Sequence, residues 1–272
     1  MDRVLFIRTL QAQRSKLLIV AVALGIWGVL MPLIYAQLID TPLGARFKEM
    51  IDSGLFPAQF AQFGGGNLFT LPGSIALGFI HPIFVAIVCV FAIGFTVAAV
   101  AGERQRGTLE VVLARPISRR KAYGSLLGAT IVLVGLAILA MVAGTLASSA
   151  VFGKLDELDL GQVPLLWLNT VLLYIALGSV ALAASVSFDR LAPALGITLG
   201  FALVSYFFQI LGSLWPDAEP LQPFSLFHYL DPAAILDGTG DPFDLVLLAL
   251  VTLLVVGWAL VVFPRRDLAA PS

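Results

Sequence analysis

The chain has 272 residues, of which 59% are hydrophobic and only 12% are charged, and its formal net charge is −1. Soluble globular domains are about 45–50% apolar and about 25% charged, so this composition excludes an ordinary soluble fold. Lipid must solvate much of the surface instead. We therefore expect an all-α, polytopic membrane protein that forms one domain over residues 1–272, because a helix satisfies its backbone groups without water. The single cysteine, Cys89, excludes an intrachain disulfide.

Six stretches without charged residues are long enough to cross a membrane. About 20 helical residues span the ~30 Å hydrocarbon core of a bilayer. The first stretch follows a basic segment, residues 1–16, which we expect to form an amphipathic helix ahead of a retained first span and not a cleaved signal peptide. The predicted transmembrane helices are residues 17–39, 80–101, 122–152, 163–187, 191–214 and 245–264.

Two of the segments that connect these spans are long enough to fold. The stretch LGARFKEMIDSGLFPAQF, within residues 40–76, has a mixed apolar and charged spacing that suits a helix lying on the outer membrane surface. Residues 215–243 contain five prolines and are predicted to form a folded or re-entrant outer cap.

Basic residues are distributed unequally between the connecting segments. If the N-terminus is cytoplasmic, the inner segments hold 13 of the 16 Lys and Arg residues and carry a net charge of +8, whereas the outer segments carry −9. Cytoplasmic loops of membrane proteins are enriched in Lys and Arg. The sequence therefore predicts that the N- and C-termini are both cytoplasmic.

The one sizeable cytoplasmic loop is GERQRGTLEVVLARPISRRK, residues 102–121, which carries eight ionised side chains, six of them basic. Residues 103–115 are predicted to form a short cytoplasmic helix between spans two and three. Leu109, Val112 and Leu113 would share one face of this helix, at positions i, i+3 and i+4.

Several residues of the loop favour particular local contacts. Glu103 and Arg106 can form an ion pair at i, i+3. Arg115 precedes Pro116 and is therefore disfavoured in a helix, so the short helix should end there. Ser118 can then cap the third span.

Arg119, Arg120 and Lys121 follow in the first helical turn of that span, where the helix dipole disfavours positive charge. One interpretation is that they set topology and contact lipid headgroups. The other is that they belong to a docking surface for a cytoplasmic partner.

The loop resembles the cytoplasmic loop of ABC-2 type transport permeases, in which a Glu, a Gly-Thr-Leu-Glu run and a Pro-x-Ser-Arg run follow one another. The matching residues are Glu103, Gly107, Thr108, Leu109, Glu110, Pro116, Ser118 and Arg119. In the family this loop also lies between spans two and three of six. The resemblance implies that the short helix is a coupling helix that fits a groove on an ATPase, and the residues thereby assigned to coupling are Glu103, Arg104, Arg106, Gly107, Thr108, Leu109, Glu110, Val112, Leu113, Arg115, Pro116, Ser118 and Arg119.

The resemblance further implies a permease subunit of an ATP-driven exporter in the inner (cytoplasmic) membrane. Two such subunits, identical or different, would work with two cytoplasmic ATPase subunits and contact membrane lipid. ATP and Mg would bind to the ATPase. The chain itself would be no enzyme and would bind no cofactor, metal or nucleic acid, and none of its four lysines follows the glycine pattern of a phosphate-binding loop.

Two other functional classes fit six spans. An intramembrane hydrolase needs a nucleophile facing a base; the two histidines, His81 and His228, lie near the predicted outer boundary, and no G-x-S-x-G motif is present. An ion-coupled secondary transporter usually keeps an ionisable residue at mid-membrane. The predicted spans contain none there, and Asn169 and Gln209 are expected to hydrogen-bond across helices.

Two pairs of glycines could bring helices close together. They are Gly124-x-x-x-Gly128 and Gly196-x-x-x-Gly200, each on one face of a predicted span.

The charge distribution generates a topology prediction. Single cysteines placed in a Cys89→Ala background at Glu110 and Arg266 should react with an impermeant thiol reagent only after the cell is opened. Cysteines at Lys48 and Asp237 should react in intact cells. Labelling of position 237 only after opening would contradict the predicted orientation.

Overall fold

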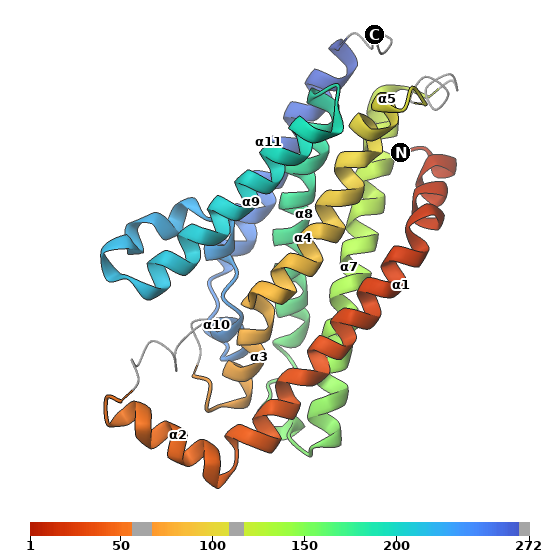
Figure 1. Ribbon diagram of the computed structural model, residues 1–272. Coiled ribbons are helices and arrows are strands. Elements are labelled where there is room, and N and C mark those ends of the chain that lie inside the picture. The colour runs from red at the N-terminus through yellow and green to blue at the C-terminus, as the bar shows by residue number, and fades with distance from the viewer. Residues whose placement is uncertain (56–66, 109–116, 267–272) are drawn as a thin grey trace.

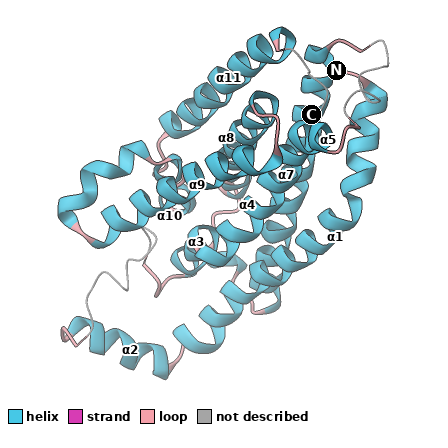
Figure 2. Cartoon of the chain, turned by 45° about the horizontal axis from the view of Figure 1, so that its top comes forward, coloured by secondary structure: helices cyan, strands magenta, loops and turns pink. Residues whose placement is uncertain are grey.

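A computed structural model describes residues 1–55, 67–108 and 117–266. All regular elements within these ranges are helical, with no strand among them (Figure 2). Six of these helices are long and apolar enough to cross a membrane, which confirms the expected all-α, six-span fold. They are α1 (Arg3–Ile34) with its π-helical extension η1 (Tyr35–Ile39), α4 (Pro82–Val97) with η3 (Ala98–Gly102) and α5 (Glu103–Gln105), α7 (Arg119–Val151), α8 (Val163–Ser187), α9 (Leu191–Leu214) and α11 (Pro242–Arg265).

The helices form one bundle in which α4, α7 and α8 occupy the middle (Figure 1). In both views α1 lies on one flank, while α9 and α11 lie on the other. Several parts of the chain meet at one end of the bundle, which we call the basic end. They are the start of α1, α5, the start of α7, the turn between α8 and α9 and the end of α11. The opposite, acidic end carries α2 (Pro42–Asp52) and η4 (Leu155–Glu157).

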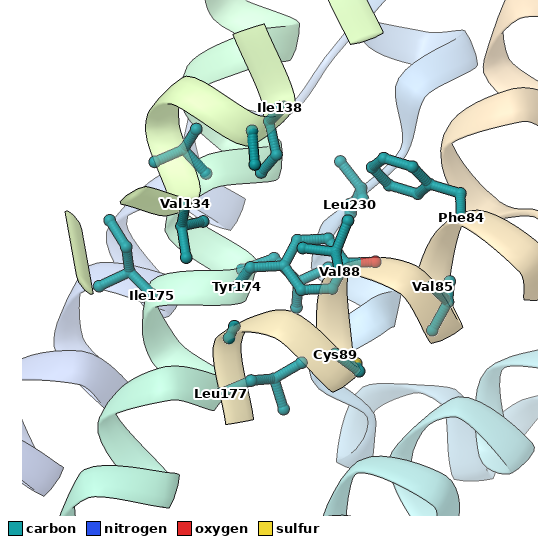
Figure 3. Packing of buried hydrophobic residues seen from close by; sticks show 14 of the residues in the cluster. Phe84, Val85, Val88, Cys89, Val134, Ile138, Tyr174, Ile175, Leu177 and Leu230 are labelled. Atoms are coloured by element: carbon teal, nitrogen blue, oxygen red, sulfur yellow. The ribbon is translucent and has the colours of Figure 1, made fainter. Parts of the chain in front are cut away.

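Helix α8 lies at the centre of the bundle. It is apolar nearly all round, as expected for a helix that other helices surround. Its Tyr174 is fully buried and packs edge-on against Phe84 of α4, with ring centroids 5.8 Å apart. Val88 of α4 and Ile138 of α7 belong to the same buried cluster (Figure 3). The core therefore lies where α4, α7 and α8 meet.

Helices α1 and α7 pack with their backbones almost in contact. A Cβ atom built on Gly28 would lie 2.2 Å from the carbonyl oxygen of Met141, and one built on Gly144 would lie 2.2 Å from that of Gly25. The Ser148 hydroxyl donates to the carbonyl oxygen of Val29 across the same contact, at 2.9 Å. Small residues allow this close approach, and the resulting van der Waals contact and hydrogen bond stabilise helix pairs in lipid.

The glycine pairs expected from the sequence are mostly not the ones that join helices within the chain. Cβ atoms built on Gly124, Gly196 and Gly200 would meet nothing within 4 Å, whereas Gly128 packs against Phe6 at the start of α1. The spacing of four residues identifies a face that permits close packing, but it does not say whether another helix covers that face.

Some helix boundaries differ from the predicted ones. α1 is continuous from Arg3, so no break separates an amphipathic helix 1–16 from the first span. A separate helix, α3 (Leu71–Ile80), precedes α4, and the second span therefore begins at Pro82. The break has a local cause, because a residue before proline is driven out of the helical region, and His81 has ψ of 138°.

The described parts of the connecting segments at the acidic end are folded. The surface helix expected within residues 40–76 corresponds to α2. The segment expected as a cap forms three short elements, η5 (Pro216–Phe224), η6 (Leu226–Tyr229) and α10 (Pro232–Leu236). It folds back on α9, where the buried Ser205 hydroxyl accepts a hydrogen bond from the backbone N–H of Leu226 at 2.8 Å.

The α1–α7 contact leads to a stability prediction. Gly28→Ala and Gly144→Ala should each lower the free energy of unfolding by about 1–3 kcal/mol, since the added methyl group overlaps a carbonyl oxygen of the facing helix. Gly196→Ala is the matched control, because its methyl group meets open space and helix propensity alone should raise stability by up to about 1 kcal/mol. The measurement is thermal unfolding of the purified protein in detergent, and equal melting temperatures for all three variants would refute the close approach.

Candidate functional site

The loop that carries the predicted coupling residues is described at both of its ends. Residues 103–108 and Ile117–Ser118 are placed, whereas Leu109, Glu110, Val112, Leu113, Arg115 and Pro116 lie outside the described residues. The predicted apolar face of the short helix is therefore untested and stays a prediction.

The first part of the loop is a single helical turn. The expected ion pair between Glu103 and Arg106 is present, and the Thr108 hydroxyl donates to the Glu103 carboxylate at 2.6 Å. Gly107 has φ of +70°, a left-handed conformation that glycine adopts without strain and that commonly ends helices. The prediction of one continuous helix from Glu103 is therefore wrong at its start, because α5 ends at Gln105.

Arg104 and Gln105 tie this turn to the α8–α9 connection. The guanidinium of Arg104, whose side chain is only 10% exposed, lies 2.6 Å from the carboxylate of Asp189. The side-chain oxygen of Gln105 accepts a hydrogen bond from the backbone N–H of Leu191, the first residue of α9, at 2.9 Å. The loop thus holds the turn between two spans through a charged and a neutral contact.

Asp189 also binds the end of the last span. Its carboxylate accepts from Arg266, which in addition donates to the carbonyl oxygen of Val186 at 3.0 Å. Sequence reasoning missed Gln105, Asp189 and Arg266 as members of the site. The available signal was that Asp189 is the acidic residue in the short connection between two apolar spans, where a carboxylate needs a cation.

The second part of the loop begins α7. Ser118 caps that helix as predicted and accepts a hydrogen bond from the backbone N–H of Lys121 at 3.3 Å. The guanidinium of Arg119 donates to the carbonyl oxygens of Phe263 and Pro264 at 3.1 and 3.3 Å, and Arg120 donates to that of Leu260 at 3.3 Å.

These contacts explain why positive charge occurs in the first turn of α7. The last carbonyls of a helix have no intrahelical partners and carry partial negative charge. Arg119 donates to two such carbonyls at the end of α11, and Arg120 donates to that of Leu260, whose i+4 residue, Pro264, has no N–H to donate. The favourable interaction with the end of α11 therefore offsets the unfavourable interaction with the first turn of α7. Neither of the two sequence-based interpretations included this role.

The residues considered for other functions do not form a catalytic or ion-binding group in the described part of the chain. His81 accepts a hydrogen bond from the backbone N–H of Ile83 at 3.2 Å and so caps α4. No hydrogen bond joins the imidazole of His81 or His228 to a serine or cysteine side chain in that part of the chain, and His228 reaches Ser225 only through a backbone hydrogen bond. The expected interhelical hydrogen bonds of Asn169 and Gln209 are not formed by their side-chain oxygens, which are buried without a partner among the described residues.

Comparison with protein families assigns the chain to a family. Residues 10–268 match the model of the ABC-2 family transporter protein, and this match covers nearly the whole chain. The chain therefore belongs to the ABC-2 transporter family, and with its six apolar helices it is a multi-pass membrane component of an ABC transporter. A comparison with curated proteins finds no match to it.

The shared carboxylate leads to a prediction about stability. Asp189→Ala should lower the free energy of unfolding by about 1–2 kcal/mol, because it removes two partly exposed ion pairs that are each worth up to about 1 kcal/mol. Asp237→Ala, at the opposite end of the bundle, is the control and should change stability by no more than about 0.5 kcal/mol. Chemical unfolding in detergent at low and high salt measures both variants, and an Asp189→Ala loss that salt does not reduce would contradict the ion-pair account.

Proposed function

We propose that the chain is the permease subunit of an ATP-driven ABC-2 type exporter, in which a separate ATPase chain binds ATP with Mg and hydrolyses it. The observation that carries the proposal is the family match over residues 10–268 of a six-span bundle. The sequence lacks a phosphate-binding loop of its own, which is consistent with ATP binding elsewhere.

The proposal places the basic end of the bundle in the cytoplasm and the chain in the inner membrane. Its support is the charge distribution, +8 on the inner segments against −9 on the outer ones. In this orientation the loop of residues 103–118 faces the ATPase, with Leu109, Val112 and Leu113 as its apolar contact.

The contacts at the basic end supply a means of transmission. Arg104 and Gln105 hold the α8–α9 turn, and Arg119 holds the end of α11. A displacement of the loop by the ATPase would therefore act on four spans together: α7, which the loop enters directly, and α8, α9 and α11, which it contacts. Little of the movement would be lost in flexible chain.

A second permease subunit is part of the proposal, because one bundle of this size has a filled core and does not enclose a wide path. α1, α9 and α11 carry many exposed large apolar side chains, which lipid or a second subunit can cover. The transport path would then lie between two subunits, identical or different.

The proposed coupling contact leads to a prediction. Leu109→Asp should abolish co-purification of the ATPase, because the aspartate would lose its water without gaining a partner, at a cost of several kcal/mol. Only ~1.4 kcal/mol is needed to weaken binding ten-fold. The measurement is the amount of ATPase recovered with the tagged permease at equal membrane levels.

The matched control is Leu160→Asp, which changes an exposed leucine at the acidic end and should leave the complex intact. The purified permease alone should hydrolyse no ATP. Full retention of the ATPase and of substrate-stimulated ATP hydrolysis by Leu109→Asp would refute the coupling contact. ATP hydrolysis by the permease alone would refute the proposal that a separate chain hydrolyses ATP.

A further inference from the structure

The flank of the bundle between α1 and α4 contains two adjoining hollows. The first, of about 440 Å³, lies at the basic end between α1, the end of the second span and the start of α7. The second, of about 590 Å³, runs along α1 and α4 toward the middle of the bundle. Lys16 and Phe95 line both hollows, so together they form one groove, which we call the α1–α4 groove.

The upper part of the groove has a basic rim. Arg8, Lys16 and Arg106 line it together with one acid, Glu103, which is already paired with Arg106. Arg8 and Lys16 form no ion pair with any described acidic residue. Two positive charges on one face of α1 are thus left for an anion.

The same part of the groove holds an unused hydrogen-bond acceptor. The side-chain oxygen of Gln13 is buried and has no hydrogen-bond partner among the described residues, and Gln13 lines the hollow between Arg8 and Lys16. A buried polar atom without a partner costs free energy. A ligand that combines an anionic group with a hydroxyl donor would bind the two cations and, once the Gln13 amide rotates toward the hollow, satisfy this oxygen.

The lower part of the groove is apolar. It is lined by Ile19 and Ala23 of α1 and by Ala86, Val90 and Gly94 of α4, without a charged residue below Lys16. From Phe95 to Ala86 it follows α4 for about 13 Å at 1.5 Å per residue, which is close to half the ~30 Å hydrocarbon core. Its length therefore suits the acyl chain of a lipid in one leaflet.

We propose that the α1–α4 groove binds an anionic phospholipid with a hydroxyl-bearing headgroup, such as phosphatidylglycerol. Arg8 and Lys16 bind the phosphate, Gln13 accepts a hydrogen bond from a headgroup hydroxyl, and an acyl chain lies on Ile19, Val90 and Gly94. The charged end of the groove lies at the basic end of the bundle, where a headgroup would be. The inference stands on charge, the unpartnered oxygen and the apolar groove, and it does not depend on coupling to an ATPase.

Two variants test the two halves of the groove. Arg8→Gln with Lys16→Gln removes the charges that hold the phosphate. Gly94→Leu extends a side chain into the apolar part from a Cβ atom that meets nothing within 4 Å. The matched controls are Arg3→Gln with Arg14→Gln, which removes the same charge from α1 outside the groove, and Gly200→Leu, which fills open space on α9.

The measurement is native mass spectrometry of the full-length protein, purified in detergent and mixed with phosphatidylglycerol or phosphatidylcholine of identical acyl chains. The wild-type chain should retain phosphatidylglycerol at least about ten-fold more strongly than phosphatidylcholine. Each groove variant should reduce retention of phosphatidylglycerol about ten-fold, while both controls behave like the wild type. Gly94→Leu changes no charge and its Cβ atom meets no neighbour within 4 Å, so it keeps the test decisive even if the double variant fails to fold.

Three outcomes would overturn the proposal. Equal retention of the two lipids would show that the headgroup is not recognised. Equal losses in the controls would show that only general surface charge or general contact with lipid is involved. Displacement of phosphatidylglycerol by soluble glycerol phosphate, with Gly94→Leu unchanged, would show a site for a free phosphate ester and not for a lipid.

Discussion

Charged side chains are excluded from hydrocarbon, and in the described residues every ion pair lies at one of the two ends of the bundle. At the basic end Asp189 joins the loop after the second span to the α8–α9 turn and to the end of α11. At the acidic end Lys154 lies 2.5 Å from Asp40 and 2.7 Å from Glu157, and the hydrogen bonds that it donates to both carboxylates raise the pKa of the lysine. Polar contacts thus fix how the spans are connected, and apolar packing between the ends fixes how closely they approach.

The pair of α1 and α7 shows how these constraints combine. At the acidic end Lys154, just after α7, binds Asp40, just after η1. In the middle the glycine contact brings the two backbones together, and at the basic end the backbone N–H of Asp2 donates to the Ser125 hydroxyl at 2.6 Å. We expect two helices held at both ends and in the middle to move as one body. In the proposed exporter, a force on the start of α7 would therefore move α1 and the α1–α4 groove with it.

The sequence predicts the long helices because hydrocarbon demands about 20 apolar residues per span, and few other arrangements of this composition are stable. It did not predict α3, whose ten residues are too short for that criterion and whose buried position depends on neighbours far along the chain. The α1–α7 contact was also missed, because 25 glycines give many small-residue spacings and only the fold decides which of them face another helix. In the loop, local contacts such as the Ser118 cap could be predicted from the spacing of residues. The partner of Arg104, Asp189, lies 85 residues away, so no local pattern in the sequence predicts their ion pair.

The basic first turn of α7 changes the role assigned to Arg119. The family motif includes this arginine among the coupling residues, and a rim charge on the ATPase interface was the simplest reason for it. Its guanidinium is instead occupied by carbonyl oxygens of α11 and lies over the ring of Phe263, with 6.0 Å between the guanidinium carbon and the ring centroid. Arg119 therefore positions α11 relative to α7. In the proposed exporter, binding to the ATPase then falls to the apolar residues of the loop. Its polar residues Arg104 and Gln105 carry the displacement to the α8–α9 turn, and Arg119 carries it to α11.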